Sequence, residues 1–437
     1  MASIRKRKNS YQITVSNGVD TNGKRIERTM TYHPDPSLTP KQQEKALNKA
    51  VMEFEEKVKN ENCFDGDRMT FSEFYEKWYN ECGKIELEKT TLGVYDFNIR
   101  SKVLPSIGNL KLSAIKPLHL TTLYNALRQE GARMDSKQTG YASATIHKVH
   151  TAISSVLDKA VLWDVIEHNP CSKIKKPKGT KDTDNIDFFT DEEVLRFFSA
   201  LDMEYNKPFK ERKRKNNAGE EYTVASYQQK ITIPMQFKVL FYLAIYSGAR
   251  RGELISLQWD DIDFKNNTLN ISKSTGYTNR EMYLKGTKNK SSNRLISLPL
   301  SVMNMLRKYK KQYLEYQLQL GSEWAIDENG NRLNFLFIQS NGKQMHISTP
   351  LKKFHSILEM YNGTVSNECD KLPIIPFHGL RHTSATLLIS QGVDIVTVSK
   401  RLGHADVSTT LNIYAHALRK MDNVASEKLE ELLIREA

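Results

Sequence analysis

The chain carries Phe377-His378-Gly379-Leu380-Arg381-His382 near its C-terminal end, followed by Leu402-Gly403-His404 and then by Tyr414. Upstream of this series stands Ser247-Gly248-Ala249-Arg250-Arg251-Gly252-Glu253. Arginine offers a rigid cationic fork for phosphate oxygens, histidine moves a proton near neutral pH, and tyrosine can become a covalent nucleophile. Two arginines, two histidines and a tyrosine in this order can hold a phosphodiester and attack it without a metal ion.

The length, composition and charge of the chain indicate its number of domains and the kind of partner it binds. With 437 residues the chain is long enough for two or three domains, at least one of which has a core of ordinary size. Hydrophobic residues make up 39% and charged residues 26%, which is typical of a soluble globular protein. The net charge of +13 favours a polyanionic partner, and an unspecialised basic protein is the alternative on charge alone.

The sequence contains no evident membrane, targeting or metal-binding signal. No run of 18 apolar residues occurs, and the basic start of the chain lacks the apolar segment of a signal peptide. The four cysteines lie far apart, without a Cys-x-x-Cys pair or a nearby pair of histidines: Cys63, Cys82, Cys171 and Cys369. We therefore expect no metal, no cofactor and no disulfide framework, and a reducing cytoplasm as the compartment.

Residues 1–60 predict a small three-stranded β-sheet followed by a helix. Apolar and polar residues alternate over 11–15, Asn22-Gly23 favours a tight hairpin turn, and a further strand follows. Thr39 is the expected N-cap of a helix that runs to about Asn60. A basic three-stranded sheet can lie in a DNA groove, whereas a solvated basic face is the alternative. The candidate DNA-binding residues of this segment are Arg5, Lys6, Arg7, Lys8, Lys24 and Arg25.

Residues 68–172 are predicted to be all-helical, because their apolar residues recur at helical spacing. We expect helices over 71–79, from Thr90 onward, over 118–127 and over 144–160. Several basic residues of this segment are candidates for contacts with a phosphate backbone, although each of them taken alone is more often a solvated surface charge. They are Lys89, Arg100, Lys102, Lys116 and Lys148.

A polar, charged run over 173–186 contains proline and glycine and predicts an extended linker between domains. Thr190 then begins a helix that has acidic residues in its first turn. Residues 204–231 are polar and predict an exposed insertion before an apolar helix over 237–246.

The turn after this apolar helix places Arg250 near the start of the next helix, which is a favourable place for an anion. Glu253 follows three residues later and can pair with and orient an arginine, whereas a surface salt bridge is the alternative. His378 and Arg381 are also three residues apart and should project from one face at the entrance of a helix. His382 should point elsewhere and have a structural role.

Short strands are expected over 269–271, 281–284 and 294–298, with a basic hairpin tip between the last two. A lysine at such a tip can be delivered into a DNA groove, but taken alone it is usually a solvated charge. The lysines of the tip are Lys285, Lys288 and Lys290.

The end of the chain predicts two further helices. Asp394 caps the first helix, and Gly403 ends it, so that His404 faces a cleft. Ser408 is expected to cap a second helix, from Thr409 to about Ala417, that carries Tyr414. On its own a tyrosine with apolar neighbours is usually part of a core, and only the complete series argues for a nucleophile.

The complete series resembles the tyrosine recombinase, or phage integrase, family. The order in this family is an arginine, a hairpin lysine, His-x-x-Arg, a histidine or tryptophan, and a tyrosine. The Gly-x-Arg-x-x-Glu box of the family corresponds to residues 248–253, with Ser247 where threonine is usual. By this resemblance the catalytic residues are Arg250, Lys288, His378, Arg381, His404 and the nucleophile Tyr414. The register ahead of Leu298-Pro299 selects Lys288, with Lys285 and Lys290 as alternatives.

The resemblance implies a mixed α/β multidomain chain. Residues 1–60 would be an arm-type DNA-binding domain, residues 68–172 a helical, SAM-like core-binding domain, and residues 173–186 a linker. Residues 187–437 would form a mainly α catalytic domain with a small antiparallel β-sheet, the DNA breaking–rejoining fold. This domain would end in a helical tail that docks either on a neighbouring protomer or on its own domain.

The resemblance also implies a site-specific recombinase that integrates and excises a bacteriophage or an integrative or conjugative transposon. Such an enzyme forms a 3′-phosphotyrosyl intermediate and exchanges strands through a Holliday junction, without a metal or ATP. The implied partners are double-stranded DNA at core and arm attachment sites, a homotetramer, an excisionase and a host DNA-bending protein, and the implied location is the bacterial cytoplasm at the nucleoid. A resolvase of replicon dimers, a type IB-like topoisomerase, a metal-dependent nuclease and a non-catalytic DNA-binding regulator are the alternatives.

Overall fold

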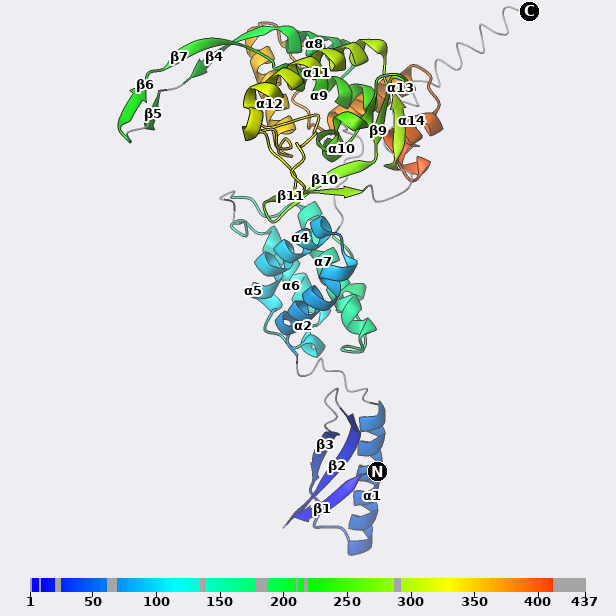
Figure 1. Cartoon of the computed structure of the whole chain (residues 1–437). Helices are drawn as coiled ribbons and strands as arrows, with labels where there is room; N and C mark the ends of the chain where they lie inside the picture. Colours follow the sequence, from blue (N-terminus) through cyan, green and yellow to red (C-terminus); the bar gives the residue numbers. More distant parts are fainter. Residues whose placement is uncertain are drawn as a thin grey trace, which may run out of the picture. The chain divides into compact units, whose positions relative to one another are not determined.

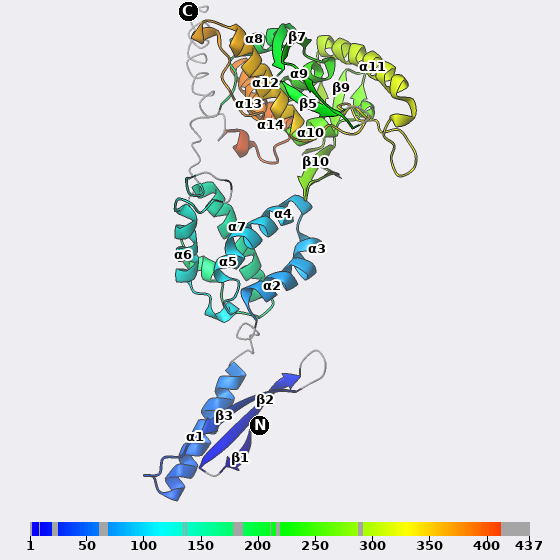
Figure 2. The ribbon, with the colours of Figure 1, turned by 90° about the vertical axis from the view of Figure 1, so that its left-hand side faces the viewer.

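The computed structural model describes residues 2–7, 9–19, 25–60, 69–133, 135, 138–177, 187–209, 211–215, 219–286 and 292–411. The chain divides into two compact units, Met1–Lys181 and Asp182–Ala437, which Figures 1 and 2 show from two directions. Among the described residues no helix combines the length and the apolar character that a membrane crossing requires.

The first part of the N-terminal unit is an antiparallel sheet of order β1-β2-β3, packed against one helix (Figure 2). Its elements are β1 (Ser3–Arg7), β2 (Ser10–Val19), β3 (Arg25–Tyr32) and α1 (Pro40–Asn60). Strand alternation turns Ile13 and Val15 toward α1, where both are buried. The helix begins where the sequence predicts, because the backbone N–H of Thr39 donates to Oε1 of Gln42 at 3.1 Å. The predicted sheet and helix are thus confirmed, whereas the predicted turn at Asn22-Gly23 lies outside the described residues.

The second part of this unit is all-helical, as its apolar periodicity predicts. Its α-helices are α2 (Phe71–Trp78), α3 (Lys84–Glu86), α4 (Lys89–Asn98), α5 (Leu104–Ile107), α6 (Pro117–Arg128) and α7 (Ser143–Leu162). Single π-helical and 3₁₀ turns connect them: η2 (Tyr79–Gly83), η3 (Ile99–Val103), η4 (Leu112–Ala114) and η5 (Pro170–Lys173). Phe71, Phe74 and Trp78 of α2 are almost fully buried in a core of their own. The helix expected from Thr90 begins one residue earlier, with Glu88 at its N-cap.

The predicted linker over 173–186 is partly an ordered segment. Lys173 ends η5, and Ile174 packs on the helical core. A ring nitrogen of His147 in α7 lies 3.1 Å from the carbonyl oxygen of Pro177. Residues 178–186 are outside the described part of the chain.

The second unit is built around the apolar helix α9, which packs among the other helices of the unit (Figure 1). Its α-helices are α8 (Asp191–Asp202), α9 (Met235–Ser247), α10 (Arg251–Ser256), α11 (Leu300–Leu320), α12 (Thr349–Thr364), α13 (Gly379–Ser390) and α14 (Ile395–Leu402). The ring of Phe197 on α8 lies 5.5 Å from that of Phe241 on α9 and 5.3 Å from that of Phe354 on α12. Such edge-to-face contacts add to the burial of the rings themselves.

Small antiparallel sheets flank α10 and α11 in this unit. They are formed by β8 (Ile262–Asp263), β9 (Thr268–Ile271) and β12 (Arg294–Ser297) in the order β12-β9-β8, and by β10 (Lys273–Thr278) with β11 (Glu281–Gly286). The expected hairpin between 281–284 and 294–298 is therefore wrong. Leu269 of β9 faces Ile296 of β12, and these buried side chains pair the two strands across the intervening hairpin. The polar strand β10 has no alternating pattern, so the sequence did not reveal it as the partner of β11.

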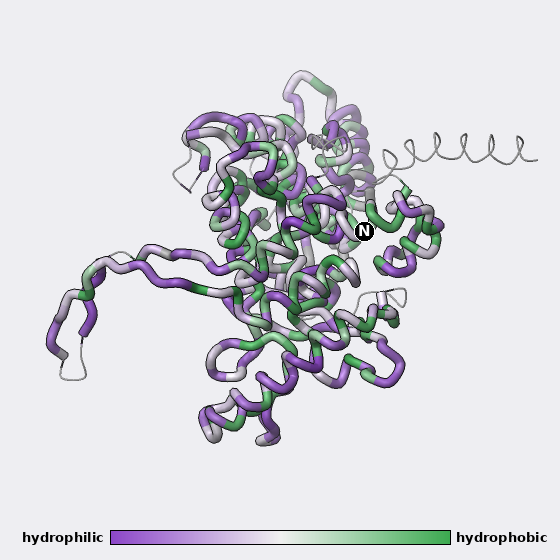
Figure 3. The backbone as a smooth tube through the Cα atoms, turned by 90° about the horizontal axis from the view of Figure 1, so that it is seen from above, coloured by the Kyte–Doolittle hydropathy of each residue, from purple (hydrophilic) through white to green (hydrophobic). Residues whose placement is uncertain are grey.

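The described residues of 204–231 are mostly exposed, as predicted, but they form a long two-stranded ribbon (Figures 1 and 3). Strand β4 (Glu204–Phe209) pairs with β7 (Tyr227–Thr232), and β5 (Arg212–Lys215) pairs with β6 (Glu221–Val224). No strands were predicted here, because most of these residues are polar, and the few aromatic and aliphatic ones, such as Tyr205 and Ile231, do not alternate regularly with polar residues. The expected fold class, mixed α/β with a mainly α second unit and small antiparallel sheets, is confirmed.

Candidate active site

The turn between α9 and α10 is shaped by a glycine. Gly248 has φ +61°, a left-handed conformation that residues with a side chain rarely adopt. A Cβ atom at this position would lie 2.7 Å from Cδ2 of Leu402. The carbonyl oxygen of Gly248 accepts a hydrogen bond of 2.7 Å from Nη1 of Arg381. The same turn thus begins the helix after Arg250 and anchors the second arginine of the series.

Glu253 orients Arg250, as the sequence analysis expects. Oε2 of Glu253 accepts the backbone N–H of Arg250 at 2.9 Å, and Oε1 lies 3.0 Å from Nη1 of the same arginine. The side chain of Glu253 is 3% exposed, whereas that of Arg250 is 41% exposed. The alternative of a simple surface salt bridge does not hold, because one partner is a buried carboxylate.

Arg294 is a second cation on this carboxylate, and the sequence analysis missed it. Its Nη2 lies 2.8 Å from Oε2 of Glu253 in an ion pair whose two side chains are almost fully buried. Burial by itself raises the pKa of Glu253, but the hydrogen bond and charge of Arg294, and then those of Arg250, hold it below its usual value. Glu253 is therefore charged at neutral pH.

Arg294 also connects two further segments of the chain. Its Nε donates to the carbonyl oxygen of Arg401 at 2.7 Å, and its Nη1 donates to that of Ser292 at 3.0 Å. Gly403 makes room for the guanidinium, since a Cβ there would lie 2.8 Å from Nη1. One buried side chain thus joins α10, the end of α14 and the start of β12. A basic residue at the start of a predicted strand carries no sequence signal of this role.

The His-x-x-Arg segment lies at the beginning of α13, which starts at Gly379. His378 occupies the N-cap position and is exposed, whereas Arg381 is 3% exposed. The rings of His378 and His382 meet edge to face with centroids 4.8 Å apart. His382 thus packs against His378, although it was expected to point elsewhere.

His404 follows the left-handed Gly403 that ends α14, as predicted. Its Nδ1 lies 2.8 Å from Oγ1 of Thr410. Residues 407–411 are helical, and Asp406 caps them by accepting the backbone N–H of Ser408 at 2.8 Å. The expectation that Ser408 is the cap was wrong, because the carboxylate two residues earlier takes the orphan amide.

The four described side chains of the series influence one another electrostatically. The pKa of His404 falls to about 4, because burial disfavours the charged ring and because Arg381, Arg250 and Arg294 add positive charge. The pKa of His378 is also lowered, first by desolvation and then by Arg381 and Arg250. The structure thus brings two guanidinium groups and two neutral imidazoles to one place, at the C-terminal ends of α9 and α14 and the N-terminal end of α13. Lys288 and Tyr414 are outside the described residues.

We expect α14 to lose protection from unfolding as the pH falls from 6.5 to about 4. In the unfolded chain His404 takes up a proton near its ordinary pKa of 6.5, whereas in the folded chain it does so only near 4. The unfolded state therefore binds more protons in this window, so that stability falls with falling pH. The measurement is hydrogen exchange of the α14 amides in the full chain, corrected for the intrinsic pH dependence of exchange.

His404→Gln should weaken this dependence, because glutamine does not titrate, whereas His382, whose pKa burial also lowers to about 4, and His378 retain part of it. His168→Gln replaces an exposed histidine of the other unit and should leave the dependence as it is in the parent chain. Protection of α14 that stays constant from pH 6.5 to 4 in the parent chain would contradict the prediction.

The structure shows on which face of the sheet, or how exposed, the candidate DNA-binding residues of the first unit are. Paired residues share a face, so Arg5, opposite Gln12, and Arg7, opposite Ser10, lie on the sheet face away from α1. Lys6 lies on the other face, opposite Tyr11. Arg25, Lys89 and Lys148 are exposed, whereas Lys8 and Lys24 are outside the described residues.

Two of the other suggested phosphate contacts are engaged within the protein. Lys102 is 6% exposed, and its Nζ lies 3.0 Å from Oδ1 of Asn98. Arg100 pairs with Glu76 and with Asp96, each at 2.6 Å. The suggested phosphate contact of Lys102 was wrong. Asn98 lies one helical turn earlier, and the lysine side chain binds it instead of facing solvent.

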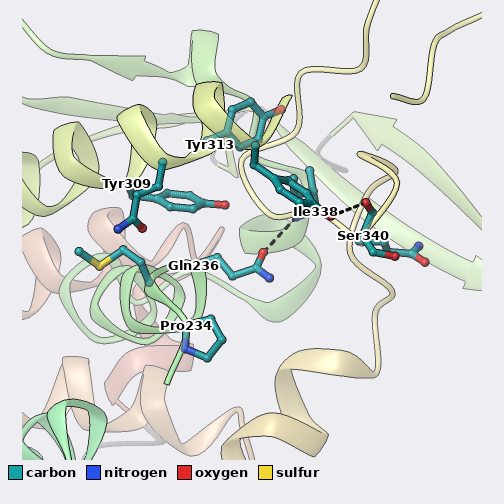
Figure 4. Close-up of a pocket in the computed structure, with 10 residues that line it drawn as sticks. Pro234, Gln236, Tyr309, Tyr313, Ile338 and Ser340 are labelled. Carbon is teal, nitrogen blue, oxygen red and sulfur yellow. Dashed lines mark hydrogen bonds between the residues drawn. The ribbon is translucent and has the colours of Figure 1, made fainter. Parts of the chain in front are cut away.

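The second unit also contains a pocket that is lined mainly by α11 and the start of α9 (Figure 4). Tyr309, Tyr313 and Tyr316 of α11 line it together with Gln236, whose Oε1 accepts the backbone N–H of Ile338 at 3.5 Å. Gln236 stands at the start of α9, about 20 Å along the helix from the turn at its other end. The pocket is therefore separate from the candidate active site. Among the described residues no group of three acidic, histidine or cysteine side chains could hold a metal ion.

Comparison with known proteins gives the family. The model described as Phage integrase family matches residues 220–421, and the one described as Phage integrase, N-terminal SAM-like domain, matches residues 70–128. A tyrosine recombinase XerC-like protein of Caldanaerobacter subterraneus subsp. tengcongensis is 28% identical, over 99% of this chain and 98% of its own. The ICEBs1 integrase of Bacillus subtilis is 25% identical, over 68% of each chain.

A solved structure supports the fold. The integrase of transposon Tn1549, in complex with transposon right end DNA, superposes with a TM-score of 0.61 at 20% identity. The match covers 83% of this chain and all of that one. These comparisons favour the integrase interpretation over the resolvase, topoisomerase, nuclease and regulator alternatives. The chain belongs to the phage integrase family of tyrosine recombinases, which are DNA strand-transfer enzymes.

Proposed function

We propose that the chain integrates and excises a mobile genetic element, with Tyr414 as the nucleophile that cuts and rejoins DNA strands. The observation that carries the proposal is the cluster of Arg250, His378, Arg381 and His404 at the meeting ends of α9, α13 and α14. Tyr414 follows His404 by ten residues, on the C-terminal side of the helical turn at 407–411. The cluster offers cationic forks and neutral imidazoles, which are the groups that this chemistry requires.

Arg250 and Arg381 are proposed to hold the non-bridging oxygens of the scissile phosphate. Arg381 is fixed by Gly248, and Arg250 is fixed by Glu253, so both forks are oriented before DNA arrives. Preorganised donors stabilise the charge that grows on a phosphoryl group in the transition state. The exposed side chain of Arg250 gives this part of the cluster access to a substrate.

The two histidines are proposed to act as neutral rings. If the hydroxyl of Thr410 donates to Nδ1 of His404, the ring proton is on Nε2, which can donate to a phosphate oxygen. His378 is exposed and its lowered pKa keeps the ring unprotonated at neutral pH, so it can accept the phenolic proton. The pKa shifts therefore suit a hydrogen-bond donor and a base.

Cleavage and rejoining are proposed to be the same displacement at phosphorus, run in opposite directions. The phenolic oxygen of Tyr414 attacks phosphorus while its proton passes to His378, and the bond to the 5′-oxygen breaks. Lys288 supplies a proton to this leaving oxygen. The products are a 3′-phosphotyrosyl link and a free 5′-hydroxyl, so the phosphodiester energy is retained and no ATP is needed. Attack by the 5′-hydroxyl of another strand reverses the step and leads through a Holliday junction.

The proposed substrate is double-stranded DNA, bound at core and arm attachment sites by a homotetramer. The Tn1549 integrase was solved with transposon end DNA, and a lambda integrase tetramer was solved on a Holliday junction. In this proposal residues 1–60 bind arm sites through Arg5 and Arg7, residues 68–172 bind the core site with help from Lys89 and Lys148, and residues 187–437 cut it. An excisionase and a host DNA-bending protein would set the direction of the reaction, in the bacterial cytoplasm at the nucleoid.

A covalent-trapping experiment tests the proposal. The full chain is incubated, in EDTA, with nicked duplexes from the ends of the element that carries its gene, so that the cut fragment is lost and the adduct persists. We expect an adduct that resists denaturation and maps by mass spectrometry to Tyr414. Tyr414→Phe is the control, which should bind the same duplex and form no adduct. An adduct on another residue, or cleavage that stops in EDTA, would contradict the proposal.

A further inference from the structure

The ribbon of β4, β5, β6 and β7 stands away from the helices of its unit (Figures 1 and 3). Only its base is packed: Tyr205 is buried and its hydroxyl donates to the carbonyl oxygen of Ala200 at 2.5 Å, while Ile231 lies against the core. In β5 and β6 every side chain is exposed except that of Val224, which is half-buried. A two-stranded ribbon without a packed face is marginally stable in water. Packing against the hydrophobic core of the unit therefore does not explain why the outer part of the ribbon is present.

The ribbon is long enough to extend well away from the helices of its unit (Figures 1 and 3). Phe209 and Tyr227 face each other at the end of the β4–β7 pair, with ring centroids 4.9 Å apart and planes 11° from parallel. Strands β4 and β5 have six and four residues. At about 3.3 Å per residue they amount to roughly 30 Å of extended chain, close to one turn of B-form DNA.

The register gathers arginine on one face of the outer ribbon. Arg212 lies opposite Val224, and Arg214 lies opposite Tyr222. Because alternate residues share a face, these four side chains lie together. Tyr222 is 47% exposed, so its phenol is presented beside the two guanidinium groups. We name Arg212, Arg214 and Tyr222 the arginine face.

The opposite face has the same number of basic residues but a different character. Lys213 lies opposite Thr223, and Lys215 lies opposite Glu221. Nζ of Lys215 is 3.6 Å from Oε1 of Glu221. Within β5 and β6 the only carboxylate is thus on the lysine face, and the arginine face carries none.

We propose that the arginine face binds duplex DNA next to the segment that the catalytic cluster holds. Arginine forks match phosphate oxygens bidentately, and a tyrosine hydroxyl is a further donor to the backbone. The major groove, about 12 Å wide, admits a two-stranded ribbon. The base of the ribbon is at the start of α9, about 20 Å from the turn that carries Arg250. The proposed contact therefore extends the length of DNA that the protein binds and does not take part in cleavage. The inference rests on the proposed function, since the bound DNA is the recombination site.

A pair of matched variants tests the contact in the full chain. Arg212→Gln with Arg214→Gln removes two charges from the arginine face, and Lys213→Gln with Lys215→Gln removes two charges from the lysine face. Each protein is titrated with duplexes from the element ends, one trimmed to the core and one with flanking DNA. We expect the arginine variant to bind the flanked duplex about tenfold more weakly, and its slope of log affinity against log salt to fall by about 2. On the trimmed duplex it should bind like the parent chain.

Footprinting supplies the second readout. Hydroxyl-radical protection should shorten by about one turn, about 10 base pairs, on one side for the arginine variant and stay unchanged for the lysine variant. Equal losses for both variants would reduce the effect to general charge and overturn the proposal. Unchanged affinity and footprint, or a change in protomer association alone in sedimentation, would overturn it as well, the latter in favour of a protein contact.

Failure of this contact and failure of the proposed function are distinguishable. The arginine variant should form the covalent adduct with the nicked core duplex at the rate of the parent chain, because the ribbon is outside the catalytic cluster. Absence of the adduct from the parent chain would count against the proposed function and not against the DNA contact.

Discussion

Arg381→Ala is expected to slow strand cleavage by about 100- to 1,000-fold, because one preorganised donor to the developing charge is worth roughly 3–4 kcal/mol. Arg381 is 3% exposed, and Gly248 holds its Nη1 at 2.7 Å. Its fork is thus set before the substrate binds, and solvent cannot replace it. The rate is measured in a single turnover with the nicked duplex at saturating DNA, so that weaker binding does not enter.

The control variants separate charge, geometry and folding. Arg381→Lys keeps the charge but not the fork, and should recover only part of the rate. Arg251 is next to Arg250 in the sequence but is outside the cluster. The variant Arg251→Ala should therefore cleave like the parent chain. Hydrogen exchange of the α13 amides checks that the helix stays folded. A rate for Arg381→Ala within tenfold of the parent's would contradict the proposed role.

Arg294→Met should cost the second unit up to about 3–5 kcal/mol of its free energy of unfolding, because removing one partner of a buried ion pair leaves Glu253 with only the half-exposed Arg250 as counter-charge. Glu253 and Arg294 are 3% and 6% exposed, so water cannot replace the lost partner. The carbonyl oxygens of Arg401 and Ser292 lose a donor in the same variant. The measurement is urea-dependent hydrogen exchange of the α10 amides in the full chain.

A double variant and a surface control make this prediction specific. Arg294→Met with Glu253→Gln removes both charges, and should be more stable than Arg294→Met alone. Arg307→Met makes the same substitution at an exposed arginine, and should change stability by about 0.5 kcal/mol or less. A loss below about 1 kcal/mol for Arg294→Met would show that the pair contributes little.

Features that depend on neighbours in the sequence were predicted well. Thr190 caps α8 with Glu193 in a reciprocal capping box, and Asp394 caps α14 through the amides of Val396 and Thr397. Gly403 ends α14 in a left-handed conformation. Each of these needs only a few adjacent residues, so local geometry and backbone hydrogen bonding decide them.

Features that depend on distant partners were not predicted. The pairing of β12 with β9 and of β11 with β10 follows from which side chains are buried together, and the short strands share no distinctive period. The strands of the ribbon between β4 and β7 are mostly polar and show no regular alternation of apolar and polar residues, so the sequence did not predict them. Lys102 reads as a surface lysine, and only the packing of the helical core shows that it is buried.

For the candidate active site, the sequence by itself determined which groups are present and in what order, since a specific series of arginine, histidine and tyrosine needs no coordinates to be read. Only the tertiary structure decided how these groups are held. Arg294 is distant in sequence from Glu253 and from Arg401, yet it binds both. The physical reason is that a buried charge must find its partners wherever the fold brings them, and folding, not sequence spacing, sets those distances.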